Sequence, residues 1–189
     1  MKSNRILILN SSPKAGGTIS RILCEMKQGA EGCEVDYVDV TKADIGYCKG
    51  CMSCRSGLEC AVYQDDAQKI LEKMRWCDVL VIGAPCYWQN MPAPLKALFD
   101  RIVYGLVTVT KTGLKPLLKG KKCVIVTACT TPSPFHWLLN QSRATVTAIK
   151  RIVKPAGFDV VKTIEIAGTA NKQLTESELR KYRDVIGKL

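Results

Sequence analysis

The strongest constraint on this chain is a fivefold alternation between short apolar runs and helix-like segments. The runs fall at 5–10, 34–40, 78–84, 122–128 and 159–167, and the helical patterns fall at 18–28, 65–75, 92–103, 142–153 and 175–189. Alternating units of this kind predict an α/β fold in which helices cover both faces of a parallel sheet. Right-handed crossovers favour a doubly wound, three-layer sandwich with five parallel strands in the order 2-1-3-4-5. Ligands of such sheets bind where the strand order reverses, between strands 1 and 3.

The length of 189 residues predicts a single domain over 1–189, with 41–63 as a cysteine-rich loop inserted after the second strand. No run of 18 apolar residues occurs in the sequence, which argues against a membrane-spanning helix. The first residues enter a strand-like run without the apolar core of a signal peptide, which predicts a cytoplasmic location. The formal charge of +11 comes from dispersed Lys and Arg, and this dispersion favours a solvated surface over nucleic-acid binding.

The loop after the first strand has the composition of an anion site. Residues 10–20 read Asn-Ser-Ser-Pro-Lys-Ala-Gly-Gly-Thr-Ile-Ser. Hydroxyls and free backbone N–H groups at a helix N-terminus suit a phosphate monoester, and Gly16 and Gly17 let the backbone turn closely around it. The loop matches neither a Walker loop nor a GxGxxG loop. Taken alone, it is also consistent with simple helix capping.

The loop after the third strand brings aromatic groups to the same edge of the sheet. Residues 83–92 read Gly-Ala-Pro-Cys-Tyr-Trp-Gln-Asn-Met-Pro. The adjacent side chains Tyr87 and Trp88, with several backbone amides beside a phosphate site, suit a flat ring that forms hydrogen bonds. The alternative is an aromatic anchor that packs the loop onto the fold. The two loops together are more specific than either one.

Three stretches taken together resemble the NAD(P)H-dependent FMN reductases, which have a flavodoxin-like fold. These stretches are Ser11-Ser12-Pro13-Lys14 with Gly17-Thr18, then Gly83-Ala84-Pro85-Cys86-Tyr87-Trp88, then Pro94-Leu95-Lys96-Ala97-Leu98-Phe99-Asp100-Arg101. The resemblance covers essentially the whole chain. It implies an FMN-dependent oxidoreductase with NAD(P)H as co-substrate, assembled as a homodimer or homotetramer. It also implies that the last stretch supports the fold and subunit packing.

The resemblance implies a set of FMN-binding residues in two loops. Around the phosphate it implies Ser12, Lys14, Thr18 and Ser20, next to Ser11, and around the ribityl chain and ring it implies Pro85, Cys86, Tyr87, Trp88 and Asn90. Thr127, at the end of the fourth strand, is expected to approach the flavin. No residue is assigned as catalytic, because the flavin itself performs the chemistry. Gly17 replaces the usual Asn in a loop that is one residue shorter, so Thr18 and Ser20 stay alternatives for the phosphate contact.

Four clustered cysteines, Cys48, Cys51, Cys54 and Cys60, have the spacing C-x₂-C-x₂-C-x₅-C. Four thiolates so close repel one another unless a cation or cluster takes up their charge, and short spacers let the sulfurs converge. The spacing resembles the compact motif of the iron–sulfur flavoproteins, a branch of the same family. This resemblance implies a 4Fe–4S cluster that lies near the flavin of a neighbouring subunit and relays single electrons.

Three other readings of the clustered cysteines stay open. They are an unmetallated loop that shapes the substrate site, a zinc site and thiols for redox sensing. The remaining cysteines, which are scattered through apolar stretches, are mostly interpreted as small hydrophobic core residues.

The loop after the fourth strand contains His136, the single histidine, between Phe135 and Trp137. A histidine near a flavin suggests a general acid. Because hydride transfer to a flavin needs no protein acid, a lid or a subunit contact through the two aromatic residues is favoured instead.

The leading functional hypothesis is therefore a flavin oxidoreductase that passes electrons to the cluster, a quinone, a nitro compound or free flavin. The alternative is a non-enzymatic, flavodoxin-like electron carrier whose basic surface would dock on acidic ferredoxins. The predicted partners are small-molecule or ferredoxin-type electron donors and acceptors and further copies of the chain. Nucleic acid and membrane partners are not expected.

Overall fold

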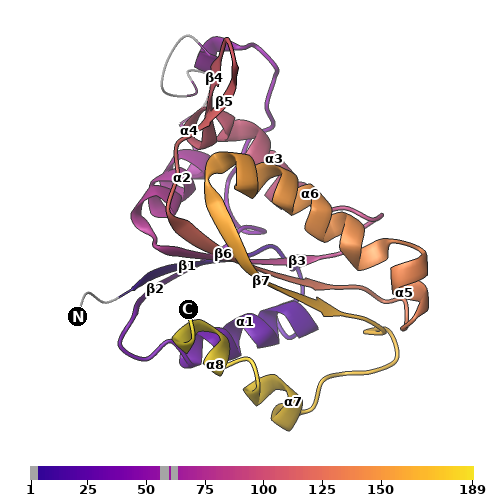
Figure 1. Cartoon of the computed structure of the whole chain (residues 1–189). Helices are drawn as coiled ribbons and strands as arrows, with labels where there is room; N and C mark the ends of the chain where they lie inside the picture. The colour runs from indigo at the N-terminus through magenta and orange to yellow at the C-terminus, as the bar shows by residue number, and fades with distance from the viewer. Residues whose placement is uncertain (1–3, 56–59, 61–63) are drawn as a thin grey trace.

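A five-stranded parallel sheet forms the centre of the computed structural model, which describes residues 4–55, 60 and 64–189 (Figure 1). Its strands, in spatial order, are β2 (Glu34–Asp39), β1 (Arg5–Asn10), β3 (Val79–Pro85), β6 (Lys121–Ala128) and β7 (Phe158–Ile166). Counted along the chain within this sheet, the order is 2-1-3-4-5, which confirms the prediction. Each end of each predicted strand lies within one residue of the observed end.

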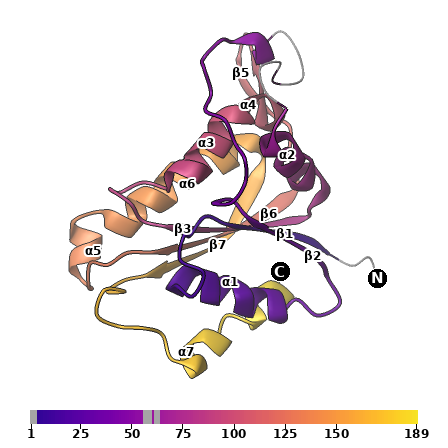
Figure 2. The same ribbon diagram turned by 180° about the vertical axis from the view of Figure 1, so that it is seen from behind.

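Helices cover both faces of the sheet, as the two views in Figures 1 and 2 show. One face carries α2 (Asp66–Trp76), α3 (Ala93–Arg101), α4 (Val103–Leu106) and α6 (Gln141–Ala156), and the other carries α1 (Thr18–Gln28), α7 (Glu176–Arg180) and α8 (Asp184–Gly187). Alternate strand residues enter the two layers, so Leu80 and Ile82 pack on the α6 side while Val79 and Val81 pack on the α1 side. In the described part of the chain, no helix is both long and apolar enough to cross a membrane.

The helix predicted over 92–103 ends at Arg101, and the separate helix α4 begins at Val103. Two further helix ends differ from the prediction, and the first lies in α6. The helix predicted to stop at 153 continues to Ala156 with Pro155 inside its last turn, and Gly157 ends it with φ of +108°. A proline inside a helix costs the hydrogen bond to the carbonyl group four residues earlier, yet here the helix continues for one residue beyond Pro155. The left-handed glycine, rather than the proline, therefore ends this helix.

The second difference is at the C-terminus, where the helix predicted over 175–189 is divided into α7 and α8. The break lies where Arg183 meets the end of α1. Its Nε donates to Glu25 Oε2 (2.5 Å). Its carbonyl oxygen lies so close to Gly29 that a Cβ added to this glycine would be only 2.1 Å from it. This packing against a distant segment bends the chain, and the local periodicity of 175–189 contains no sign of it.

An antiparallel hairpin of β4 (Val107–Thr110) and β5 (Gly113–Pro116) was not expected from the sequence. It projects beyond the sheet (Figure 1) beside residues 48–55, which include the short 3₁₀ helix η1 (Ser53–Arg55). The alternating Val-Thr-Val-Thr run and Gly113, with φ of +137°, are the signals that indicate it. The rest of the predicted loop over 41–63 falls partly outside the described residues.

A buried ion pair joins the end of α3 to the residue that caps α2. Arg101 Nη1 donates to Asp65 Oδ2 (2.6 Å) and to the carbonyl oxygen of Gly46 (2.8 Å), and the two charged side chains are 1% and 8% exposed. Burial alone would raise the pKa of Asp65, but Arg101 and the amides of Gly46 and Ala67 hold it below its ordinary value. Arg101 also hydrogen-bonds Cys60. The pair therefore attaches both ends of the cysteine-rich segment to the helical layer.

Helix α1 approaches β3 very closely at Gly83. A Cβ added to Gly83 would lie 2.5 Å from Leu23 Cδ1 and 2.7 Å from Ile19 Cγ2, both in α1. These distances are far inside van der Waals contact, so the close approach of helix and strand requires glycine at this position.

We expect the substitution Gly83→Ala to lower the free energy of unfolding by about 1–3 kcal/mol, because a methyl group added to a filled interface forces side chains or backbone to shift. Urea unfolding followed by circular dichroism measures this change. Gly187→Ala is the control, because a Cβ at Gly187 in α8 would meet no atom within 4 Å. Equal stability of the wild type and Gly83→Ala would contradict the close packing of α1 on β3.

Candidate functional site

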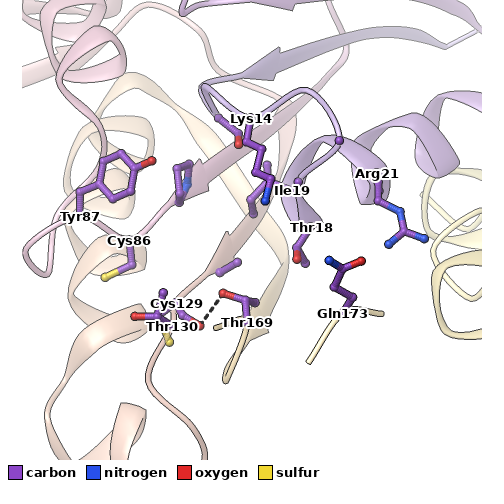
Figure 3. A pocket seen from close by; sticks show the side chains of 15 residues that line it. Lys14, Thr18, Ile19, Arg21, Cys86, Tyr87, Cys129, Thr130, Thr169 and Gln173 are labelled. Carbon is purple, nitrogen blue, oxygen red and sulfur yellow. Dashed lines mark hydrogen bonds between the residues drawn. The ribbon is translucent and has the colours of Figure 1, made fainter. Parts of the chain in front are cut away.

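A cavity of about 260 Å³ opens at the carboxyl edge of the sheet, next to the point where the strand order reverses between β1 and β3 (Figure 3). We call it the edge cavity. Its walls come from the loop after β1 with the start of α1, from the loop after β3, and from the segments that follow β6 and β7.

The α1 wall of the edge cavity is cationic and rich in hydroxyl groups. Ser12, Lys14, Thr18 and Arg21 line it, and Figure 3 shows the last three along one side. The N-cap residue of α1 is Gly17, which forms no side-chain hydrogen bond to the first-turn amides. Among the described residues, no acidic side chain lines the cavity. Positive charge at a helix N-terminus makes this wall suitable for a phosphate group.

The β3 wall of the edge cavity ends in a strained two-residue turn. Pro85, Cys86 and Tyr87 line the cavity, and the backbones of Tyr87 and Asn90 exchange two hydrogen bonds of 2.9 Å. The turn residues between them, Trp88 and Gln89, have φ of +50° and +61°. Such turns strongly favour Asn and Gly, and left-handed bulky residues of this kind concentrate at functional sites.

The third wall joins the segments after β6 and β7. Ala128 ends β6, Cys129 and Thr130 follow it, and Thr169 and Gln173 reach the cavity from the segment after β7. Thr169 Oγ1 donates to the carbonyl oxygen of Cys129 (3.0 Å), the dashed line in Figure 3. This bond holds the two segments together at the mouth of the cavity.

In comparisons with known proteins, the family of proteins with the flavodoxin-like fold matches residues 4–189. The chain belongs to this family. An iron–sulfur flavoprotein of Methanosarcina thermophila is 38% identical over 101 residues, which are 52% of this chain and 52% of the relative. An FMN-dependent NADH:quinone oxidoreductase of Haemophilus influenzae is 41% identical over 104 residues, 54% of this chain and 50% of the relative.

The chain spans about half the length of these curated relatives. Among solved structures, an FMN-dependent NADH-azoreductase from Bacillus anthracis in complex with FMN superposes with a TM-score of 0.68. The two chains are 16% identical, and the match covers 98% of this chain and 99% of the azoreductase. At this identity the comparison shows that the flavodoxin-like fold is shared.

Six of the eleven binding residues predicted from the sequence line the edge cavity of this flavodoxin-like protein. They are Ser12, Lys14, Thr18, Pro85, Cys86 and Tyr87. Nine residues that line it were not among the predicted binding residues. Besides Gly16, Gly17, Ile19 and Ala128, there are five others, two of which follow β6 in a loop expected at this edge. These five are Arg21, Cys129, Thr130, Thr169 and Gln173. The position of Arg21, one turn after Thr18 on α1, is the signal that could have indicated it.

The other five predicted residues do not line the cavity. Ser11 Oγ donates to the carbonyl oxygen of Gly83 (2.8 Å), and Ser20 Oγ donates to that of Lys14 (3.0 Å), so both hydroxyls hold the loop. Thr127 is buried, with its Oγ1 unpartnered among the described residues. The remaining two, Trp88 and Asn90, are exposed beside the cavity. The position of Ser20 favours Thr18 as the residue that meets an anion.

The clustered cysteines do not line the edge cavity. Cys48 and Cys51 are exposed, whereas Cys54 and Cys60 are half-buried. Within the described residues, no three His, Cys, Asp or Glu side chains are arranged to hold a metal ion. The four thiols are suitable ligands for a cluster or for zinc, but their described arrangement is not a metal site. No step of the function below therefore depends on a metal.

His136 lies in α5 (Phe135–Leu138) and does not line the edge cavity. Its ring is half-buried, and its Nδ1 has no hydrogen-bond partner in the described part of the structure. Phe135 and Trp137 on either side are exposed. A lid or subunit contact through these aromatic residues stays a prediction.

We expect Gln89→Gly to raise the free energy of unfolding by about 0.5–1 kcal/mol. A left-handed conformation costs a non-glycine residue about 1–2 kcal/mol, and the entropy that glycine loses on folding offsets part of this gain. Urea unfolding measures the change. The control is Asn90→Gly, because Asn90 has no positive φ and its replacement should lower stability. A loss of stability in both variants would contradict strain in the turn.

Proposed function

We propose that this chain is an FMN-dependent oxidoreductase that transfers electrons from NAD(P)H to a small acceptor such as a quinone. The observation that carries the proposal is the edge cavity, which unites a cationic helix N-terminus with an aromatic wall next to the switch point of the sheet. Cofactors of open α/β sheets bind at this position. The names of the relatives, FMN-dependent NADH:quinone oxidoreductase and iron–sulfur flavoprotein, support the same cofactor and reaction class.

The α1 wall would hold the phosphate end of FMN. The ammonium group of Lys14 and the hydroxyls of Ser12 and Thr18 supply charged and neutral donors there, together with the first-turn amides of α1. Arg21 lies beside these donors, held by Leu174 O (3.1 Å) and by an ion pair with Glu176 Oε1 (2.7 Å), which offsets its charge. On binding, a dianionic phosphate would thus replace its hydrogen bonds to water with hydrogen bonds to these donors of the α1 wall.

The β3 and β6 walls would orient the ring. Tyr87 offers an aromatic surface. Pro85, at the end of β3, precedes Cys86, and Thr130, just after β6, follows Cys129. These walls would hold FMN, and the hydride and electron transfer would be the chemistry that this cofactor supplies. Tyr87 is 48% exposed, so this side of the cavity leaves room for a nicotinamide or a flat acceptor to approach the ring.

The proposal is tested by reconstituting the protein with FMN and following NADH oxidation with a soluble quinone. We expect Lys14→Ala to raise the FMN concentration for half-maximal rate about 10-fold or more, because a hydrogen bond to a charged group contributes about 1.5–3 kcal/mol. Lys27→Ala is the matched control: it removes the same charge from the last turn of α1, away from the cavity, and should bind FMN as the wild type does.

Two other outcomes of this experiment have clear meanings. A wild-type protein that binds no FMN would refute the proposed function. A protein that binds FMN but oxidises neither NADH nor NADPH with quinone, nitro or azo acceptors would favour the non-enzymatic electron carrier, whose ferredoxin-type partners the net charge of +11 would attract. The homodimer or homotetramer stays a prediction that gel filtration of the same sample would test.

A 4Fe–4S cluster held by Cys48, Cys51, Cys54 and Cys60 is a separate proposal. It is supported by the four-thiol donor set, by its spacing and by the name of the iron–sulfur flavoprotein relative. After anaerobic purification or reconstitution, we expect about four irons per chain, with an equal amount of sulfide. Cys51→Ser should lose iron, whereas Cys24→Ser, which changes an exposed cysteine of α1, should retain it. Zinc without iron would favour the zinc alternative, and no metal would favour free thiols.

A further inference from the structure

Two free cysteines, Cys86 and Cys129, stand side by side where β3 and β6 end. The register pairs Pro85 with Ala128, and the next residue on each strand is a cysteine. The amide of Cys86 donates to the carbonyl oxygen of Ala128 (2.9 Å), so the parallel ladder continues to the cysteine pair. Both residues line the edge cavity, and Figure 3 shows them on the same side of it, near Tyr87.

Both thiols lie on the α6 side of the sheet. Side chains alternate along a strand, and even-numbered residues of β3, such as Ile82, pack in the α6-side cluster, as do odd-numbered residues of β6, such as Ile125. Continued four residues further along each strand, this alternation places Cys86 and Cys129 on that same side. Accordingly, Cys86 Sγ donates to the carbonyl oxygen of Gln141 (3.3 Å), the first residue of α6.

The pKa of Cys129 is consistent with a neighbouring thiol. Burial raises the pKa of Cys129, and a negative charge on Cys86 raises it further. Neighbouring strands lie about 4.8 Å apart, and a disulfide joins residues whose Cα atoms are about 4.4–6.8 Å apart. The backbone spacing therefore suits a disulfide between the two strand ends.

We propose that Cys86 and Cys129 form a redox-active pair that closes reversibly to a disulfide in the wall of the edge cavity, with low-molecular-weight disulfides as the oxidant. The closed form would tie the loop that carries Tyr87 to the segment that carries Thr130. The redox state of the pair would then set the shape of the cavity.

The reaction is an ordinary thiol–disulfide exchange. Cys86 is half-buried and Cys129 is 2% exposed, so Cys86 meets the oxidant first. Its thiolate attacks one sulfur of the oxidant, whose S–S bond breaks and releases one thiolate. The Cys129 thiolate then attacks Cys86 Sγ, forms the Cys86–Cys129 bond and releases the second thiolate. The two released thiolates take up the two protons, so the pair loses two electrons and one external disulfide becomes two thiols.

A second cysteine pair offers a matched comparison inside the same sheet. Cys77 and Cys123 lie near the opposite end of β3 and β6, and both are fully buried. Burial raises the pKa of Cys77 to about 11 and also raises the pKa of Cys123. These thiols are neither accessible nor readily ionised, and we expect them to stay reduced.

The test is oxidation of the wild-type protein with oxidised glutathione in the absence of FMN, followed by alkylation of free thiols, trypsin digestion and mass spectrometry. Cleavage after Lys and Arg places Cys86 in fragment 76–96 and Cys129 in fragment 123–143. We expect these two fragments to be joined by a disulfide that dithiothreitol reverses. Because FMN is left out, the result does not depend on the proposed function.

Each fragment also contains one cysteine of the buried pair, so two variants identify the bond. We expect Cys86→Ser to reduce the cross-linked fragments to background and Cys77→Ala to leave them at the wild-type amount. Circular dichroism confirms that each variant is folded, and Cys129→Ala repeats the test from the other strand. Absence of the cross-link in the wild type would overturn the proposal. So would a cross-link that is lost in Cys77→Ala but retained in Cys86→Ser, because it would join the buried cysteines instead.

Discussion

The close approach of α1 to β3 at Gly83 is the constraint on which the edge cavity depends. The absent side chain of Gly83 leaves room for Ile19 and Leu23 of α1, while its carbonyl oxygen accepts hydrogen bonds from both the amide and the hydroxyl of Ser11 (2.9 and 2.8 Å). One residue of β3 thus fixes the start of the first loop and the helix that follows. The cationic wall is held beside the β3 loop because both are attached to the same strand.

The cysteine-rich segment depends on a different interaction on the opposite face of the sheet. The Arg101–Asp65 pair is almost fully buried, and removing one partner of such a pair typically costs about 3–5 kcal/mol, since an unpaired charge stays behind. Gly46 and Cys60, near the two ends of the segment, both contact Arg101. The edge cavity and the cysteine-rich segment are therefore supported by separate contacts, so changes in one need not disturb the other.

The strands of the sheet could be predicted from the sequence, because strands that are covered by helices on both faces must be apolar. Central strands must be apolar on both sides, which marks their bounds clearly. By contrast, the break at Arg183 arises from packing against Gly29, a contact between distant segments.

The same distinction, between local signals and contacts of distant segments, holds for the residues of the edge cavity. Lys14 and Tyr87 were predicted because they lie in the loops after β1 and β3, where the resemblance to the FMN reductases implies binding residues, whereas Thr169 reaches the cavity from a segment without a motif. The same resemblance implied Ser11 and Ser20, but their hydroxyls donate to backbone carbonyl groups of the protein itself.

The strained turn of the β3 loop explains how an aromatic surface can stay open to solvent and still be ordered. Before the turn, the amide of Cys86 is bonded to Ala128; after it, Thr145 Oγ1 of α6 donates to the carbonyl oxygen of Asn90 (3.2 Å). Because both sides are anchored, Trp88 and Gln89 can be held in conformations that a free loop would leave. A flat ligand that binds beside Tyr87 then needs to order little of the loop, so less of its binding free energy is lost to conformational entropy.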